Sequence, residues 1–152
     1  MKLFLDTSIL YDYFAGREPF YQNALQLFIM RMFGDVDLTA SGKSYTDIFF
    51  SLKKYKEPQL IQQAFTDTLE VLSICSLDAD DIRSACKLNW LDFEDALMAV
   101  SAEKVGADYL VTRDVGIRHS KVPTKTPEEI IAIMKERGLT YRDIDISELD
   151  LS

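Results

Sequence analysis

Four aspartates spread along the chain carry the clearest chemistry in this sequence. Asp6, Asp47, Asp95 and Asp114 occur in the segments "LDTS", "YTDI", "FEDAL" and "TRDV". Carboxylate oxygens are the ligands that hard cations prefer, and a converging set of them suits Mg2+ or Mn2+ better than zinc. The four residues are therefore candidate metal ligands and candidate catalytic residues. The chemistry expected of such a set is metal-assisted hydrolysis of a phosphodiester bond.

Each of these acids also has an ordinary structural interpretation. Asp6 is a suitable helix N-cap, and Thr7 or Ser8 would cap a helix equally well. Asp47 taken alone is typical of a solvated helix position, on the flank of an apolar stripe rather than within it. Asp114 taken alone is typical of a turn. The metal-site hypothesis therefore depends on whether the fold brings the four carboxylates together.

The segment "LDFEDALMAVSA" (91–102) favours a site over simple capping. Asp92 is a candidate N-cap, Glu94 and Asp95 fall in the first turn, and the helix that follows is apolar nearly all round, which predicts burial. Three acids in four residues exceed what capping needs, and they repel one another unless a cation is present. Asp92 keeps two interpretations, as a support for the ligands or only as the cap.

Other catalytic classes are poorly supported by the sequence. The single histidine, His119, has no evident partner, and the chain has no GxSxG, Walker or GxGxxG motif. A receiver-type signalling domain needs paired acids after its first strand, whereas "LDTS" offers one acid. A phosphatase of the haloacid-dehalogenase type needs a DxD motif, whose second acid is replaced here by Ser8. Metal-dependent hydrolysis remains the best-supported chemistry.

The elements that must position the acids follow from the hydrophobic pattern. Strands are predicted at residues 2–5 and 108–112, with weaker candidates at 36–40 and 72–77. Helices are predicted at residues 18–33, 44–55, 93–102 and 127–138. Alternating strands and helices predict an α/β domain of three layers with a central parallel β-sheet flanked by helices. Ligands bind beyond the carboxyl ends of such strands, where Asp6 and Asp114 would both emerge.

Composition limits the partners and the compartment. The 152 residues, 47% of them hydrophobic, fit one compact domain, and the formal net charge of −8 argues against a polyanion partner unless the acids hold cations. Phosphate contacts are then expected from basic residues near the mouth of the site: Lys43, Lys53, Lys54, Arg113, Arg118 and Lys121. Two cysteines without a CxxC pair indicate reduced thiols and a cytoplasmic protein. No apolar run is long enough for a membrane helix or a signal peptide, so no membrane association is expected.

Four segments resemble one known family. "LDTSIL", "TASGKSYTDIFFSLKK", "DFEDALMAVSA" and "GADYLVTRD", in this order and spacing, look like a PIN domain over residues 1–136. The resemblance implies a metal-dependent ribonuclease with a pocket for Mg2+ or Mn2+ that cleaves RNA with metal-activated water. Asp6, Asp47 and Asp95 match the first three acids of the family, and Asp114 matches a position that holds Asp or Asn. Supporting roles are predicted for Thr7, Ser8, Asp92 and Thr112. Residues 137–152 are predicted to form an acidic C-terminal tail or a docked arm.

The resemblance also implies partners. Many relatives are toxins of the VapC type, which are commonly dimers and whose antitoxin typically inserts a segment into the acidic groove. RNA, an antitoxin and a second copy of the chain are therefore the expected partners.

One departure from the family pattern matters. Relatives often continue with an acid and Phe three and four positions after the fourth acid, where this chain has Ile117 and Arg118. We expect Asp114 to bind metal without that later acid, and Ile117→Asp to restore part of what Asp114→Asn loses. The alternative interpretation is a PIN fold that has lost catalysis and serves as a binding module.

Overall fold

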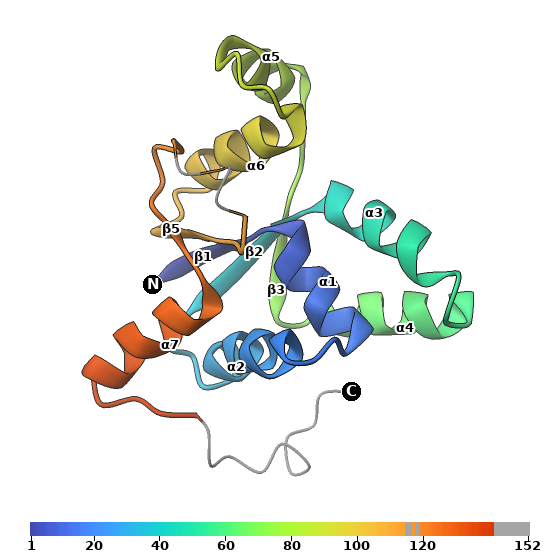
Figure 1. Cartoon of the computed structure of the whole chain (residues 1–152), viewed down its shortest axis with the longest axis vertical. Coiled ribbons are helices and arrows are strands. Elements are labelled where there is room, and N and C mark those ends of the chain that lie inside the picture. The colour runs from blue at the N-terminus through green and yellow to red at the C-terminus, as the bar shows by residue number, and fades with distance from the viewer. Residues whose placement is uncertain (115–116, 118, 142–152) are drawn as a thin grey trace.

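A computed structural model describes residues 1–114, 117 and 119–141, which form a single parallel sheet with helices on both faces (Figure 1). The strands are β1 (Lys2–Leu5), β2 (Asp37–Ser41), β3 (Leu72–Cys75), β4 (Tyr109–Val111) and β5 (Thr124–Lys125). Their order across the sheet is β3-β2-β1-β4-β5, and every neighbouring pair is parallel. The predicted parallel α/β architecture is confirmed.

The helices cover the sheet in two layers. They are α1 (Thr7–Ala15), α2 (Phe20–Met32), α3 (Gly42–Leu52), α4 (Pro58–Thr68), α5 (Ala79–Lys87), α6 (Phe93–Lys104) and α7 (Pro127–Glu136). Successive side chains of β1 point to opposite faces of the sheet. Leu3 and Leu5 therefore pack in the core formed with α1, α2 and α7, while Phe4 packs with Met98 of α6 on the other face. Strands buried on both faces explain the continuous apolar run "KLFL".

The four predicted strands and four predicted helices are all present, with ends shifted by a few residues. Helices α1, α4 and α5 and strand β5 were not among the predicted elements, although the capping interpretation of Asp6 implied a helix after it. Helix α4 buries only Ile61 and Thr68, and α5 buries only Asp81 and Ala85, so neither has a strong apolar stripe. Strand β5 has two residues, which is too short for an alternating pattern to be recognised.

The chain continues past α7 along the side of α2. Tyr141 is buried, donates a hydrogen bond from its hydroxyl to Asp35 Oδ2 at 2.7 Å, and lies 6.3 Å from Phe33 between ring centroids. The first part of the predicted tail or arm, residues 137–141, therefore packs on the fold, while 142–152 lie outside the described residues. The domain boundary at residue 136 stays a prediction.

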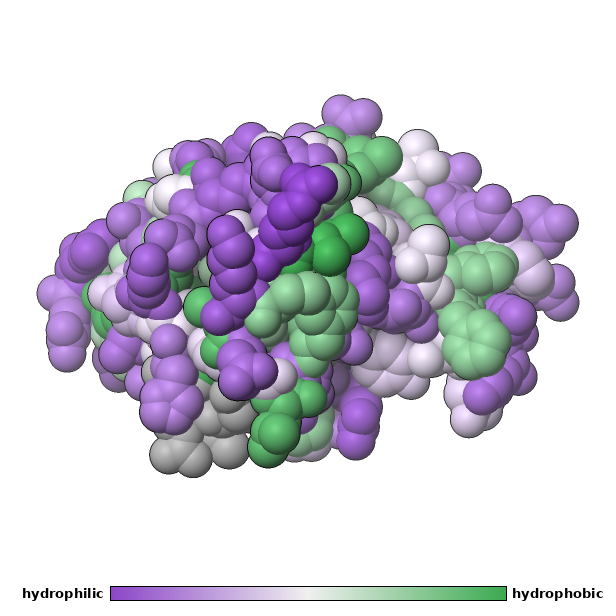
Figure 2. Space-filling view, turned by 90° about the horizontal axis from the view of Figure 1, so that it is seen from above, coloured by the Kyte–Doolittle hydropathy of each residue, from purple (hydrophilic) through white to green (hydrophobic). Residues whose placement is uncertain are grey.

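Polar side chains cover most of the surface seen from the α5 end, with a few separate apolar patches between them (Figure 2). Within residues 1–114, 117 and 119–141, no helix is long and apolar enough to cross a membrane. Both cysteines are free; Cys75 is buried and Cys86 is exposed.

Candidate functional site

Asp6 lies where β1 ends and α1 begins. Its backbone N–H donates to the carbonyl of Val111 at 3.0 Å, which joins the carboxyl ends of β1 and β4. Its carboxylate accepts hydrogen bonds from Thr7 N at 2.8 Å, Ser8 Oγ at 3.1 Å and Thr112 Oγ1 at 2.7 Å. Burial raises the pKa of Asp6, and these three donors limit the rise. Asp6 is thus both the cap of α1 and a group held at the strand ends.

Thr112 connects Asp6 to Asp114. The Thr112 side chain is buried just after β4; its hydroxyl donates to Asp6 Oδ2 and accepts from the backbone N–H of Asp114 at 2.9 Å. A second hydroxyl contact, of 2.6 Å between Thr7 Oγ1 and Ser44 Oγ, ties the start of α1 to α3. The supporting positions predicted for Thr7, Ser8 and Thr112 therefore surround Asp6 in the structure.

Asp95 lies in the first turn of α6 and is the most perturbed acid of the site. Asp92 caps this helix by accepting from the Asp95 backbone N–H at 3.1 Å. Burial, followed by repulsion from Asp114, Asp92 and Asp6, raises the pKa of Asp95 to about 7, and a hydrogen bond with Asp114 acts in the same direction. Asp6, Asp95 and Asp114 therefore form one electrostatically coupled group. Asp92 is the N-cap of α6, and its role as a support for metal ligands stays a prediction.

Asp47 is paired with a lysine instead of with this group. Lys43 Nζ lies 2.5 Å from Asp47 Oδ2, one turn along α3, and 3.7 Å from Glu94 Oε1. Partial burial opposes the charge of Lys43, but its hydrogen bond to Asp47 and the charge of Glu94 hold the pKa of Lys43 above its usual value. Lys43 was expected to contact phosphate, and in this structure it acts as the counter-ion of Asp47 and Glu94.

The donor set fits a divalent cation in its chemistry. Burial and the charge of Asp114 raise the pKa of both Asp6 and Asp95, so a positive ion would stabilise the ionised group, and oxygen ligands are those that Mg2+ and Mn2+ prefer. However, no group of three or more His, Cys, Asp or Glu side chains is arranged to hold an ion within the described part of the chain. The four predicted ligands are thus split into the coupled group of Asp6, Asp95 and Asp114 and the separate Asp47–Lys43 pair.

Arg113 contacts a buried acid that the sequence did not reveal as a site residue. Its Nε and Nη2 donate to the two carboxylate oxygens of Asp12 at 2.8 and 3.0 Å, and its guanidinium carbon lies 4.0 Å from the ring centroid of Phe20. The Asp12 side chain is 1% exposed. Arg113 thus has a structural partner in Asp12, and its contact with phosphate stays a prediction. The available signal was an acid inside the apolar run "SILYDYF", although its partner could not be read from the sequence.

The other predicted phosphate contacts are dispersed. Lys53 and Lys54 follow the end of α3, with their Nζ atoms 4.8 and 5.5 Å from the ring centroid of the exposed Phe50. Lys121 Nζ lies 3.6 Å from Glu103 Oε1. Arg118 lies outside the described residues. The expected basic rim is therefore not one continuous feature of the described surface.

The position of Ile117 contradicts the expectation that Ile117→Asp would restore metal binding. It is fully buried in the apolar cluster that contains Phe4, Met98 and Leu110. An aspartate at this position would place a carboxylate among apolar side chains, which is strongly unfavourable. Ile117→Asp is therefore expected to destabilise the fold, and the expectation that it would supply a metal ligand is wrong.

Comparisons with known proteins agree with this arrangement. A family model described as "PIN domain" matches residues 2–116. Ribonuclease VapC1 from Aquifex aeolicus (strain VF5) is 23% identical over 133 residues, covering 84% of this chain and 92% of that protein.

Solved structures share the fold. A VapBC2 complex from Rickettsia felis, bound to a DNA fragment from its promoter, has a TM-score of 0.62 at 18% identity, covering 83% of this chain and 98% of that one. Mycobacterium tuberculosis VapC20, a toxin that cleaves the sarcin-ricin loop, has a TM-score of 0.64 at 16% identity, covering 79% of this chain and 95% of that one. With the match to residues 2–116, the strand order and the acids at the strand ends, the chain belongs to the PIN-domain family.

Proposed function

We propose that this protein is a metal-dependent endoribonuclease of the toxin type, which hydrolyses RNA phosphodiester bonds with water at the acidic site. The observation that carries the proposal is the perturbed carboxyl of Asp95, whose pKa is raised to about 7 by burial and by repulsion from Asp114, Asp92 and Asp6. Strong perturbation of a carboxyl by neighbouring acids is typical of functional sites. The similarity to a ribonuclease named VapC1 supports RNA as the substrate.

In this proposal the acids hold Mg2+ or Mn2+. Asp6, Asp95 and Asp114 are the main ligands, and Asp47 joins them as the fourth. When bound, the cation supplies charge stabilisation for the phosphate and a more acidic water. Thr112 fixes the orientation of the Asp6 carboxylate, since its hydroxyl bonds both Asp6 and the backbone of Asp114.

The cap at Asp92 holds the first turn of α6, and with it Asp95, against the strand ends. Lys43, paired with Asp47 in this structure, is released to contact an RNA phosphate when Asp47 binds metal. Lys54 and Arg118 stay predictions as substrate contacts.

The proposed partners follow from the structural neighbours. Toxin-antitoxin complexes from Rickettsia felis and Klebsiella pneumoniae share this fold. We therefore propose an antitoxin partner, a homodimer and a cytoplasmic location for this chain.

A binding module without catalysis is the second candidate. It is favoured by the Asp47–Lys43 pair and by the lack of a preformed three-acid ion site among the described residues. Under that hypothesis the protein would bind RNA without cleaving it.

Cleavage of labelled RNA with Mn2+ or Mg2+, and with a chelator, tests the proposal. We expect cleavage that needs metal and that falls at least about a hundredfold in Asp95→Asn and Asp6→Asn, which corresponds to about 2.7 kcal/mol of barrier. Asp80→Asn is the matched control, because the Asp80 side chain is 87% exposed on α5. RNA binding without cleavage by the wild type at any metal concentration would instead support the binding module.

A further inference from the structure

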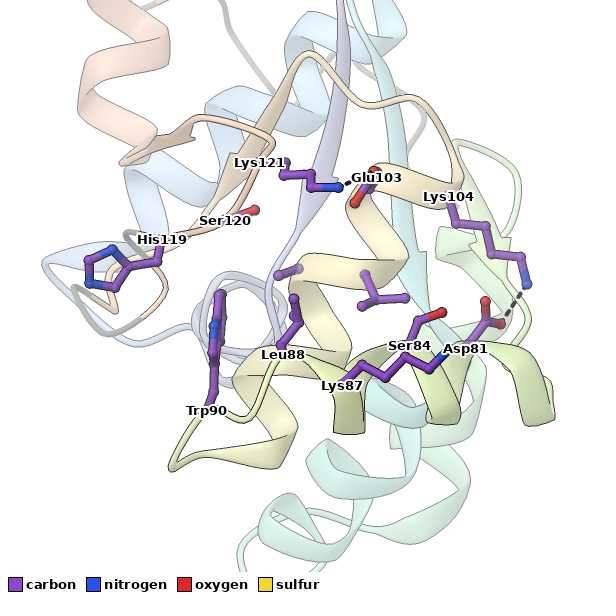
Figure 3. Close-up of a pocket in the computed structure, with 12 residues that line it drawn as sticks. Asp81, Ser84, Lys87, Leu88, Trp90, Glu103, Lys104, His119, Ser120 and Lys121 are labelled. Atoms are coloured by element: carbon purple, nitrogen blue, oxygen red, sulfur yellow. Dashed lines mark hydrogen bonds and ion pairs between the residues drawn. The ribbon is translucent and has the colours of Figure 1, made fainter.

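A groove of about 520 Å3 lies between α5, α6 and residues 119–121, on the outer side of α6 (Figure 3). The half-buried indole of Trp90 forms one wall of the groove. Lys87 lines it from the last turn of α5, and Ser120 and Lys121 line it from the segment before β5. An aromatic wall beside exposed lysines is the composition that binds single-stranded nucleic acid, because bases stack and phosphates pair with cations.

The groove and the acidic site share helix α6. Asp95 lies in the first turn of this helix, and Ala99 and Glu103, about one and two turns later on the same face, line the groove. Trp90, two residues before the cap Asp92, lines it as well. From Asp95 to Glu103 the helix rises about 12 Å, since each helical residue adds about 1.5 Å. That length matches about three to four stacked nucleotides at about 3.4 Å each. A strand cut at the acidic site would therefore reach the α6 wall of the groove with its flanking nucleotides.

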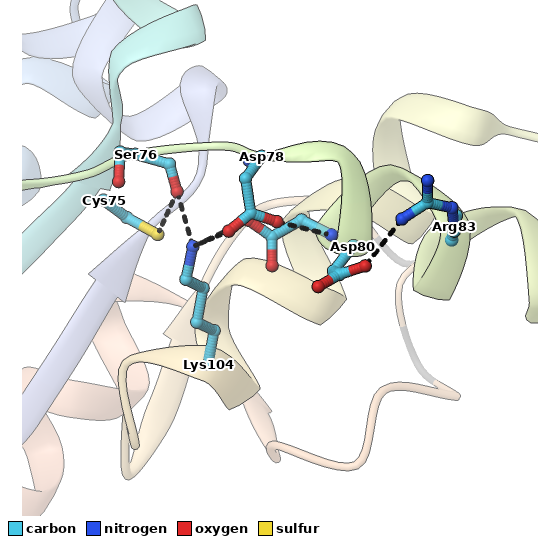
Figure 4. A network of polar contacts seen from close by, with 7 residues as sticks. Cys75, Ser76, Asp78, Asp80, Arg83 and Lys104 are labelled. Carbon is cyan, nitrogen blue, oxygen red and sulfur yellow. Dashed lines mark hydrogen bonds and ion pairs between the residues drawn. The ribbon is translucent and has the colours of Figure 1, made fainter.

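The lysines that line the groove differ in how freely they can contact a phosphate. Lys104 Nζ is held by the carbonyl of Ser76 at 2.9 Å and by Asp81 Oδ2 at 2.7 Å, and Asp78 lies 3.7 Å away (Figure 4). Lys121 has only a loose pair, 3.6 Å from Glu103, and its side chain is 78% exposed. Lys87 and Lys121 are therefore the lysines able to turn to a phosphate, with Glu103 as the competing acid.

One polar atom at the groove has unmet hydrogen-bonding capacity. The Ser120 hydroxyl oxygen is enclosed and has no hydrogen-bond partner among the residues that the structure describes. Such groups are uncommon in folded proteins, because an unpaired buried hydroxyl loses its bonds to water. Rotation of this side chain towards the groove would let a bound sugar or phosphate oxygen pair with it.

We propose that this groove binds an unpaired nucleotide of the RNA that flanks the cleaved bond. The base stacks on Trp90, and the phosphate next to it pairs with Lys87 and Lys121. This inference rests on the proposed ribonuclease function, because RNA is the ligand, but it concerns binding outside the acidic site. Under this inference, α5 and the segment before β5 help to bind the substrate.

Trp90 is the only tryptophan in the chain, so its fluorescence reports on this groove directly. A single-stranded RNA oligonucleotide is titrated into the whole protein in a chelator, where metal-dependent cleavage is prevented. We expect the oligonucleotide to quench the emission. We also expect Lys87→Ala with Lys121→Ala to weaken binding about tenfold at low salt and to reduce the log–log salt slope by about 1.4, since each phosphate contact with a single strand contributes about 0.7. Lys135→Ala, on α7, is the matched control and should leave both values unchanged.

A second measurement separates stacking from charge. Binding of end-labelled RNA, followed by fluorescence anisotropy, should stay near wild type in Trp90→Phe and weaken about tenfold in Trp90→Leu. The same RNA in a duplex should bind more weakly, because its bases are already stacked and paired. Equal binding of Trp90→Leu and wild type, or no quenching by RNA that the protein cleaves, would overturn the inference.

The outcomes also separate this inference from the proposed function. Asp95→Asn should abolish cleavage and still show full quenching of Trp90. Quenching and lysine dependence in a protein that cleaves no RNA with any metal would support the groove and refute the nuclease.

Discussion

Asp95 must serve two opposing requirements with one carboxyl group. Without metal it lies beside Asp6, Asp92 and Asp114, and repulsion together with burial favours its protonated form. With metal it must be ionised to act as a ligand, so protons and cations compete for the same oxygen atoms. The acidic site is thus sensitive to pH near neutrality.

Stability of the metal-free protein should fall as the pH rises through about 7. The pKa of Asp95 is about 7 in the folded chain, against 3.8 for an ordinary aspartate such as the unfolded chain presents, so the folded state binds the proton more tightly. This contribution is fully present below the unfolded pKa and is lost as the pH rises through the folded one. Melting temperatures in a chelator between pH 5 and pH 9 measure it.

Asp95→Asn should flatten that pH profile and raise the melting temperature above that of wild type at pH 9. Asp6→Asn is a poorer probe, because the Asp6 carboxylate accepts three hydrogen bonds that an amide can satisfy only in part. Identical pH profiles for wild type and Asp95→Asn would show that Asp95 does not titrate in this range.

At the scale of the elements, the Asp12–Arg113 ion pair joins helix α1 to the segment after β4, and both of these carry site residues. Asp12 belongs to α1, which begins just after Asp6, and Arg113 lies between Thr112 and Asp114. The bidentate pair and the ring of Phe20 fix the turn after β4 against α1 and α2. These contacts therefore help to position the acids at the ends of β1 and β4.

Asp12→Ala should lower the free energy of unfolding by about 3 kcal/mol, because removing one partner leaves Arg113 partly buried without its counter-charge. Asp80→Ala, which removes an exposed pair with Arg83, should cost less than about 1 kcal/mol. Denaturant unfolding curves of the two variants measure the difference. Equal losses in both would mean that the Asp12 pair contributes no more than a surface contact.

The elements that could be predicted from the sequence are those whose burial requires a recognisable pattern of apolar residues. Residues 3–5 are apolar because β1 is covered on both faces, and residues 96–100 are apolar because α6 packs on the sheet after its acidic first turn. Helix α5 could not be predicted in this way, since most of its surface faces solvent. The ion-pair partners of charged residues could not be predicted from the sequence either. Arg113 and Lys43 carry the charge that phosphate needs, but their nearest acids become evident only when distant segments meet.

At the scale of the whole molecule, residues 137–141 pack against the hydrophobic core beyond helix α7. Tyr141 packs beside Phe33 and bonds Asp35, in the connection between α2 and β2. Burial, and then the nearby Asp35 carboxylate, raise the pKa of Tyr141. Tyr141 therefore packs on the fold beyond the end of α7 at Glu136.

Tyr141→Ala should destabilise the protein by about 3 kcal/mol, as expected for a buried aromatic residue. Tyr141→Phe keeps the packing and removes the hydrogen bond to Asp35, at a cost of about 1 kcal/mol. Denaturant unfolding of the two variants tests whether residues 137–141 belong to the domain. A loss below about 0.5 kcal/mol for Tyr141→Ala would place the end of the domain at α7.

The strand order has a consequence for how such a protein diverges. The chain first builds the sheet outward from β1 through β2 to β3, and then returns to the other side of β1 with β4 and β5. The connections leave in opposite directions at the carboxyl ends of β1 and β4, so the meeting point of Asp6 and Thr112 is set by the backbone path. Side chains around this point can be exchanged over evolutionary time without rebuilding the scaffold. New substrates can therefore be acquired through changes around the strand ends while the path of the chain is inherited unchanged.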